Sequence, residues 1–409
     1  MKQYLTAQEV AGELGISVQT VYAYVSRGLL HSEAAGGHAH RYRRDEVEAL
    51  KSRREGRRNP ASVAAGALSW GTPVLESAIT LISDAALYYR GRDVTRLART
   101  ASFEQVAALL WLGQPDQGGD LFTERRVGPV AAPPADLPPL DRFAAALPLA
   151  AADDMTAFDL RPAALTRAGV RIIQVLAAVA TGNQPPAPSL GATLAASWRP
   201  GDDQAAAIFN AALILCADHE LNVSSFTARC VASAGAPLYA VVTAGLAALG
   251  GLKHGKQTEL TVLFLDELSG AGDIRAALAR KIRLGQPLPG FDHVLYPGGD
   301  PRARLLLDLL AEAYPAAQAL ELAREVAAAT LDLLGDHPTL DFGLATLERA
   351  LGLPAGGGLM LFALGRTAGW IGHAMEQYAA DTLIRPRARY VGERPDQDSE
   401  VRSQRSESG

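Results

Sequence analysis

Cysteine is scarce in this chain: only Cys216 and Cys230 occur among its 409 residues. Two cysteines cannot make a disulfide framework, and no CxxC pair is present. If both lie on one helix, as the surrounding pattern predicts, the 14 positions between them correspond to roughly 21 Å, which is too far for a disulfide. Reduced cysteines are typical of the cytoplasm, where we therefore expect the protein.

Long apolar runs are missing as well. No stretch approaches ~18 consecutive apolar residues, so we expect no membrane span, and the opening "MKQYLTAQEV" lacks the apolar run of a signal peptide. After the first 58 residues, the β-branched runs and hairpin dipeptides that indicate strands are few. Helical periodicity prevails there instead, with prolines and glycines concentrated between the periodic segments, and this predicts an all-α body.

Charge is shared unevenly along the chain. The net charge is −5, but residues 1–58 hold ten Lys and Arg against seven Asp and Glu, a balance of +3 that leaves −8 for the remainder. A basic head on an acidic body indicates two different partners. The alternative is an ordinary solvated surface.

Two short helices are indicated at the start of the chain. Thr6 followed by Glu9 is a capping box that opens a helix through about Glu13, and Ser17 caps a second helix that ends at Gly28. The second helix has one apolar face, made of Val18, Val21, Tyr22 and Val25. Its opposite face shows Gln19, Thr20, Tyr24 and Arg27.

A hairpin and a third helix follow. "HSEAAGGHAHRYRR" contains a Gly-Gly turn between two segments that can pair, and Asp45 caps "DEVEALKSRREGRR". This is the layout of a winged helix-turn-helix, and residues 4–50 resemble the MerR and excisionase type of DNA-binding head. The resemblance implies that the second helix enters the major groove and the hairpin follows phosphates. The implied DNA contacts are Ser17, Gln19, Thr20, Tyr24, Arg27, Arg41 and Arg43. The alternative is a small helical protein-interaction module.

The composition divides the chain into four parts. We expect the DNA-binding head over residues 1–54, a basic linker over 55–65, a helical body over 66–392 and a polar tail over 393–409. The tail lacks apolar periodicity, which predicts disorder.

Polar chemistry is concentrated where a core helix would be expected. "ADHELNVSSF" places His219 between two acids within a stretch otherwise rich in alanine, leucine and valine. His254 and His293 lie in glycine-containing turns, and glycine lets backbone and ligand approach closely. Each histidine alone is as well explained as an ordinary loop residue, and metal binding is disfavoured because no HxxxH or HExxH spacing or cysteine partner appears.

Several motifs in order then carry a second resemblance. "YRGRDVTRLARTASFEQVAALLWLG", "ADHELNVSSFTARCVASAGAPLYAVVTAGLAALGGLKHG", "PGFDHVLYPGGDPRA", "LDFGLATLERALGLP" and "GRTAGWIGHAMEQ…LIRPRARYVG" resemble the citrate synthase family. The likeness covers about residues 66–392 and is weak near 115–200. It implies an all-α dimer whose large and small domains close over the substrates.

The resemblance also implies a role for each polar residue. Asp341 would be the base, His254 would donate to the thioester oxygen, and His293 would polarise the ketone and serve as the acid. The residues implied to hold the oxaloacetate carboxylates are His219, Arg302, Arg366 and, across a dimer interface, Arg385. The ordinary pKa of an aspartate would already keep Asp341 ionised near pH 7. By its residues alone, Asp341 is as well explained as a helix N-cap, and Arg385 as a surface contact.

The chain departs from the family pattern at three places. After His254 it has Lys256, Gln257 and Thr258, where an asparagine is expected at the last position, and it has Asp292 where a glycine is expected before His293. We expect the acid beside His293 to raise the pKa of that histidine. Lys256 offers a cation to the phosphates of the thioester. No counterpart of the family's "HPM"-like segment is evident.

The resemblance therefore implies an acyltransferase of the tricarboxylic acid cycle that condenses acetyl-CoA with oxaloacetate to give citrate and CoA. Acetyl-CoA would be a co-substrate, with no bound cofactor and no metal, and the protein would be a homodimer that also binds duplex DNA. Two alternatives remain open from the sequence. One is a transcription regulator that uses a degenerate pocket as a metabolite sensor, and the other is a 2-methylcitrate synthase acting on a propionyl thioester.

Overall fold

The structure is a computed structural model in which residues 4–26, 29–34, 40–44, 46–47, 50, 75–123, 130–131, 133–388 and 390–393 are described. The predicted linker over 55–65, Arg27 and nearly all of the predicted tail lie outside these residues. Most of the predicted third helix of the head does so too.

The head has the first two predicted helices and the hairpin. Helices α1 (Ala7–Leu14) and α2 (Val18–Ser26) follow strand β1 (Tyr4–Thr6), and β2 (Ser32–Ala34) pairs with β3 (His40–Arg43). The sheet order is β1-β3-β2, so β1 adds a strand that the sequence did not predict. The capping box at the start of α1 is present, with Glu9 N donating to Thr6 Oγ1 over 3.3 Å.

The buried face of α2 differs from the predicted one. Val21 is fully buried, and Val18, Val25 and Tyr24 are partly buried against the head core. Tyr22, predicted to face that core, is 53% exposed. The placement of Tyr24 on the outer face was therefore wrong, because the helix centres its apolar face on Val21 and so turns positions three and four residues later inward.

A small antiparallel sheet opens the body, where no strand was predicted. It consists of β4 (Thr80–Ser83), β5 (Ala86–Tyr89) and β6 (Arg92–Asp93), in that order. Asp84 and Ala85 form its first turn with φ of 51° and 60°. A Gly- or Asn-containing turn is the usual hairpin signal, and its absence here explains why the sequence missed the sheet.

The remainder of the described body is helical, as predicted. Its elements are α5 (Val94–Thr100), α6 (Phe103–Leu112), η1 (Pro115–Gln117), α7 (Gly118–Thr123), α8 (Pro139–Ala152), α9 (Pro162–Thr181), α10 (Leu190–Trp198), α11 (Ala205–Cys216), α12 (Val223–Ser233), α13 (Leu238–Leu249), α14 (Lys256–Ser269), α15 (Ile274–Arg283), α16 (Pro301–Ala313), α17 (Gln318–Leu334), α18 (Leu340–Leu351) and α19 (Gly357–Ala380).

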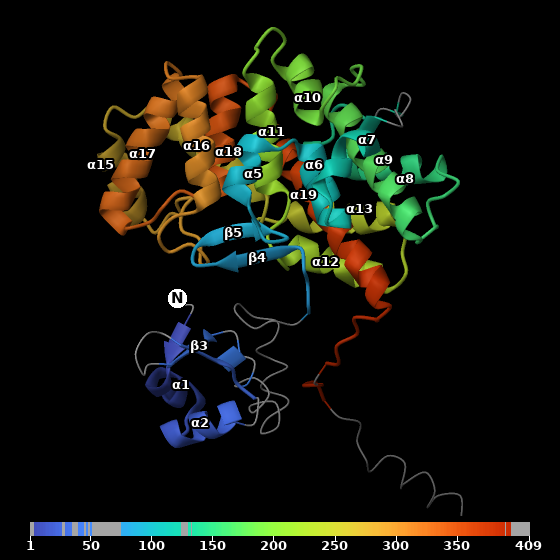
Figure 1. Cartoon of the computed structure of the whole chain (residues 1–409). Coiled ribbons are helices and arrows are strands. Elements are labelled where there is room, and N and C mark those ends of the chain that lie inside the picture. The colour runs from blue at the N-terminus through green and yellow to red at the C-terminus, as the bar shows by residue number, and fades with distance from the viewer. Residues whose placement is uncertain are drawn as a thin grey trace, which may run out of the picture.

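Two hydrophobic cores organise these helices. The larger involves α6, α9, α11, α13 and α19, and the smaller involves α14, α15, α17 and part of α18. Helix α18 belongs to both, because Leu340 and Leu344 pack in the larger core while Phe342 and Ala345 pack in the smaller. In Figure 1 the smaller group lies at the left of the body, and α8 and α9 lie at the right.

The two cysteines lie on different helices, so the prediction of one shared helix was wrong. Cys216 ends α11 and Cys230 lies within α12, and both are free thiols. The chain turns between them because Asn222 caps a new helix.

Helix α9 is long and apolar enough to cross a membrane, but 67% of that apolar window is buried inside the protein. Its Ile172, Val175 and Leu176 are part of the larger core. Its apolar composition is thus explained by its packing in the larger core.

Candidate active site

A short loop between α11 and α12 carries the polar cluster that stands out in the sequence. Glu220 takes a positive φ of 51°, which turns the chain sharply. Asn222 then caps α12 by accepting hydrogen bonds from the backbone of Ser224 and Ser225, each over 3.1 Å, and its amide donates to the His219 carbonyl. The loop is therefore fixed at both ends.

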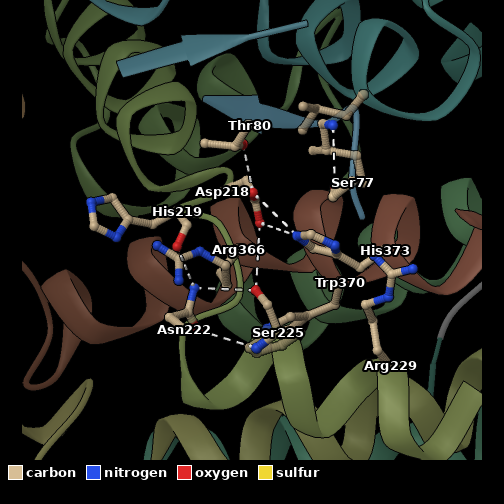
Figure 2. Close-up of polar contacts among 12 residues, drawn as sticks. Ser77, Thr80, Asp218, His219, Asn222, Ser225, Arg229, Arg366, Trp370 and His373 are labelled. Atoms are coloured by element: carbon tan, nitrogen blue, oxygen red, sulfur yellow. Dashed lines mark hydrogen bonds and ion pairs between the residues drawn. The ribbon is translucent and has the colours of Figure 1, made fainter. Parts of the chain in front are cut away.

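Asp218 lies at the centre of a buried network (Figure 2). Its Oδ2 accepts from Thr80 Oγ1 of β4 over 2.6 Å, and the ring of His373 on α19 lies 3.2 Å from Oδ1. Both Asp218 and His373 are fully buried. Burial acts to raise the pKa of Asp218, but His373 and Arg366 bring it below its ordinary value. The carboxylate is therefore ionised and ties the chain before His219 to β4 and α19.

His219 faces His293 and Tyr296. Its Nε2 lies 2.9 Å from the Tyr296 hydroxyl, and the His219 and His293 ring centroids are 5.2 Å apart. Residues 293 and 296 belong to the loop before α16. The structure thus brings together two of the predicted histidines from segments about 70 residues apart.

His254 lies in the turn before α14. Its Nε2 is 2.8 Å from Ser224 Oγ, which also accepts from the Trp370 indole over 3.1 Å. These contacts bring the His254 turn to the start of α12, next to the loop of His219. All three predicted histidines are therefore in one region.

Two buried guanidinium groups complete the cationic side. Arg302 pairs with Asp300 through two hydrogen bonds of 3.0 and 2.8 Å, and Asp300 also caps α16. Arg366 donates to the Cys216 carbonyl over 2.7 Å and forms no ion pair with any described residue. Burial acts to lower the pKa of both; Asp300 outweighs this effect at Arg302 and raises its pKa, whereas the pKa of Arg366 stays lowered.

Asp341 lies in the first turn of α18 and contacts the first turn of α14, which follows the His254 turn. Thr339 is the N-cap of this helix, so Asp341 is not the cap that its residues alone allowed. Its Oδ1 accepts from Thr258 Oγ1 over 2.6 Å. Burial raises the pKa of Asp341 to about 6, only partly offset by Thr258 and Arg302. The expectation that its ordinary pKa applies was wrong.

The histidines are neutral in this environment. Burial, with Arg366, lowers the pKa of His254 to about 3. Burial and Arg302 lower that of His293 to about 4, and the opposing effect of Asp292 is small. Asp292 acts to raise the pKa of His293, as expected, but burial and Arg302 outweigh it, because Asp292 is exposed to solvent that weakens its field. The pKa of His219 is lowered well below its usual range by burial, followed by Arg302.

Arg385 is not part of this cluster within the single chain. It is exposed, beyond the end of α19, and makes no hydrogen bond or ion pair with described residues. In the head, Arg41 and Arg43 are exposed on β3 on either side of buried Tyr42, and the Arg41 guanidinium lies 4.1 Å from the centre of the Tyr4 ring. Ser17 and Gln19 are exposed, and the Ser17 and Thr20 hydroxyls hydrogen-bond to each other.

Sequence reasoning missed several partners of the predicted residues. These are Thr80, Ser224, Asp300, Tyr296, Trp370 and His373. Two signals were available: Asp300 stands before Pro301 in an N-cap pattern, and His373 is seven residues after Arg366 on the same helix face. Thr80 had no signal, because its partner is 138 residues away.

The arrangement combines donors, cations and a base. Neutral imidazoles donate to developing oxyanions, buried guanidinium groups bind carboxylates, and a carboxyl with a pKa near 6 takes a proton near neutral pH. A mostly helical body with such a site is typical of an enzyme that forms a carbon–carbon bond on an anionic substrate. In the described residues no group of three or more histidine, cysteine or acidic side chains is placed to hold a metal ion.

Comparison with known proteins agrees with this class. The family described as citrate synthase, C-terminal domain, matches residues 67–387, and a helix-turn-helix domain family matches residues 4–55. Citrate synthase 2 of Bacillus subtilis is 28% identical over 352 residues, covering 79% of this chain and 94% of that protein. Citrate synthase of Synechocystis is 30% identical over 361 residues, covering 79% of this chain and 90% of that protein. A 2-methylcitrate synthase of Mycobacterium tuberculosis is 29% identical, covering 75% of this chain and 85% of that protein.

Solved structures show the same fold. Citrate synthase from Thermotoga maritima aligns with a TM-score of 0.67 and 25% identity, covering 79% of this chain and 94% of that one. A ternary complex of citrate synthase from Thermoplasma acidophilum with carboxymethyl coenzyme A and oxaloacetate aligns with a TM-score of 0.68 and 22% identity, covering 80% and 95%. The chain belongs to the citrate synthase family. Its body is a citrate synthase-type acyltransferase, a class that needs no metal or bound cofactor, and it carries an N-terminal helix-turn-helix domain.

Proposed function

We propose that the body condenses acetyl-CoA with oxaloacetate to give citrate and CoA. One observation carries this proposal: three neutral histidines and two buried arginines gather beside a carboxyl whose pKa is raised to about 6. The two buried arginines can bind the carboxylates of oxaloacetate, and the carboxyl group can remove a proton from the acetyl methyl group of the thioester.

In the first step, Asp341 removes a proton from the acetyl methyl group. The electron pair moves onto the thioester oxygen, where His254 donates a hydrogen bond. For Nδ1 of His254 to donate this hydrogen bond, Nε2 has to accept the proton of the Ser224 hydroxyl, which lies 2.8 Å away. That hydroxyl donates instead to Asn222 Oδ1 over 2.7 Å, so it has to turn towards His254 when the thioester binds. The Trp370 indole donates to the same serine oxygen and holds it in place.

In the second step, the enol carbon attacks the ketone of oxaloacetate. His293 donates a proton to the ketone oxygen, which becomes the hydroxyl of the product. His219, Arg302 and Arg366 hold the two carboxylates. Water then cleaves the thioester of the condensed product and releases citrate and CoA.

The remaining cation comes from a second copy of the chain. Arg385 lies on a segment that leaves the body after Thr382, where Gln377 holds the Thr382 carbonyl over 2.7 Å. The same segment exposes Leu383 and Tyr390, at 63% and 69%. Exposed apolar side chains of this kind favour packing against another subunit. We assign the protein as a homodimer in which Arg385 of the partner subunit reaches the oxaloacetate.

A thiol-release assay tests the reaction. The full-length protein is mixed with oxaloacetate and either acetyl-CoA or propionyl-CoA, and free CoA is followed over time. We expect release with acetyl-CoA and none from an Asp341→Asn control. Faster release with propionyl-CoA would favour the 2-methylcitrate activity named for the Mycobacterium relative. Oxaloacetate binding without release from either thioester would favour the metabolite sensor instead.

The head is assigned to duplex DNA, with the protein in the cytoplasm and its body serving the tricarboxylic acid cycle. Exposed Arg41 and Arg43 on β3 and exposed Gln19 at the start of α2 support this assignment, and Ser17, Thr20, Tyr24 and Arg27 stay predicted contacts. Binding to a mixed-sequence duplex should weaken as salt rises, because phosphate contacts release counterions. An affinity independent of salt would contradict the assignment.

A further inference from the structure

One side chain at the site departs from the family pattern and yet contacts the base. Thr258 stands where an asparagine was expected, and its hydroxyl donates to Asp341 over 2.6 Å. We propose that Thr258 is the positioning residue of the base: it occupies Oδ1 of Asp341 and thereby leaves Oδ2 to take the acyl proton. This inference rests on the proposed function and concerns the same site.

Thr258 is fixed by its backbone and by the packing of its methyl group. It is fully buried, its backbone N–H donates to the Gly255 carbonyl over 3.0 Å, and a methyl group added at Gly358 would lie 3.2 Å from its Cγ2. The methyl of Thr258 therefore points to the start of α19 while the hydroxyl points to α18. Because a β-branched side chain has few rotamers, this packing fixes the direction of the hydroxyl.

The hydrogen bond also links Asp341 to the segment that carries His254. Thr258 lies in the first turn of α14, four residues after His254, and the Gln257 N–H donates to the His254 carbonyl over 2.9 Å. Asp341 is on α18, which packs against α14. The contact between residues 258 and 341 thus sets the base relative to the donor for the enol oxygen, which proton abstraction requires.

Other charged groups reach Asp341 from the helices around it. At the start of α16, Arg302 favours the ionised form and Asp300 opposes it. Cys216 at the end of α11 is kept protonated because burial raises its pKa to about 12. Glu259, the residue after Thr258 on α14, acts by charge repulsion to raise the pKa of Glu348 on α18. The hydroxyl of Thr258 donates directly to the carboxylate and lowers its pKa against the effect of burial.

The step itself balances within the proposed reaction. The methyl C–H bond breaks, an O–H bond forms at Oδ2 of Asp341, and the electron pair of the C–H bond moves to the thioester oxygen. Thr258 keeps its own proton throughout and donates to Oδ1 before and after the transfer.

Two substitutions separate positioning from simple packing. Thr258→Val keeps the branched shape and removes the donor, whereas Thr258→Ser keeps the donor and removes the methyl group. For Thr258→Val we expect kcat to fall about tenfold or more, because a hydrogen bond to a charged group is lost. The rise of kcat/KM for acetyl-CoA on the acid side should move up by about one pH unit, and the KM for oxaloacetate should stay within about twofold.

A further readout is the kinetic isotope effect on kcat with trideuteroacetyl-CoA, which should increase in Thr258→Val because proton abstraction has become slower. Thr258→Ser should retain the wild-type pH profile and most of kcat. A Thr258→Val enzyme with wild-type kcat and an unmoved pH profile overturns the inference. So does an equal loss in both variants accompanied by a raised KM for oxaloacetate. A wild-type chain that releases no CoA contradicts the proposed function itself, which is a different result.

Discussion

At the scale of single residues, the site is shaped by the burial of a carboxyl group that the fold would be more stable without. The pKa of Asp341 rises from 3.8 to about 6, which corresponds to ~3 kcal/mol of stability lost at neutral pH. Because the folded-state pKa is raised, the stability is present below about pH 4 and is lost as pH increases through about 6.

Asp341→Asn should therefore stabilise the protein while stopping the reaction. We expect the thermal midpoint to increase at pH 7, where wild-type Asp341 is ionised, and the gain to shrink towards pH 4, where it is protonated. The measurement is the thermal unfolding midpoint of both proteins across this pH range, with CoA release measured in parallel. A midpoint difference that does not change with pH would show that ionisation of Asp341 does not limit stability.

At the scale of elements, α19 delivers much of the site from one face. Arg366, Trp370, His373 and Gln377 recur at intervals of three and four residues, which places them along one stripe. Gly369 lets this helix approach the 217–222 loop, since its N–H donates to the Ala217 carbonyl over 3.0 Å. A methyl group added there would lie 2.5 Å from Asp218 Oδ1.

Gly369→Ala should consequently displace the loop of His219. We expect a destabilisation of about 1–3 kcal/mol from overpacking and a KM for oxaloacetate raised about tenfold or more, measured by thermal unfolding and steady-state kinetics. Gly270→Ala is the matched control, because a methyl group at Gly270 would meet no atom within 4 Å. Similar behaviour of the two variants would mean that the loop accommodates the methyl group without moving His219.

At the scale of the whole molecule, the question is whether one chain completes its own site. The described residues bring together His219, His254, His293, Arg302, Arg366 and Asp341. Arg385 is exposed outside this set. A site shared between two subunits predicts complementation between two inactive variants.

Asp341→Asn and Arg385→Ala should each be nearly inactive alone. In a mixed dimer, one of the two sites combines Asp341 of one subunit with Arg385 of the other and is intact, so purified mixed dimers should regain about half of wild-type activity. The assay is CoA release from purified, doubly tagged mixed dimers, with separately purified variants mixed immediately before measurement as the control. Absence of recovery would show that Arg385 acts within its own chain or not at all.

The sequence predicted well where the signal is local and repeated. The capping box, apolar periodicity and hairpin of the head depend on residues within a few positions of one another, so its first two helices and its hairpin could be placed without coordinates. The ordered motifs of the body identified the family and the histidines to examine. Ser224 and Trp370 were not singled out, because their roles come from contact with His254 and with each other.

Predictions made from adjacent residues in the sequence failed where burial determined the pKa or the contacts of a side chain. Asp292 is adjacent to His293 in the chain, but its field is weak in solvent, and burial lowers the pKa of the histidine instead. Thr258 is a departure from the family pattern because it is not asparagine, yet its hydroxyl hydrogen-bonds the Asp341 carboxylate. The short hairpin of β4 and β5 escaped because its turn residues, Asp84 and Ala85, adopt positive φ without glycine.

By itself, the sequence determined that this chain is a mostly helical body with a small helix-turn-helix head, because local periodicity and ordered motifs are contained in the linear chain. Its resemblance to the citrate synthase family indicated which histidines, arginines and aspartate to propose for the chemistry. Only the tertiary structure decided which groups are buried together, and hence their protonation. Asp341 and Thr258 are separated by 82 intervening residues, and their hydrogen bond exists only because α14 and α18 pack against each other.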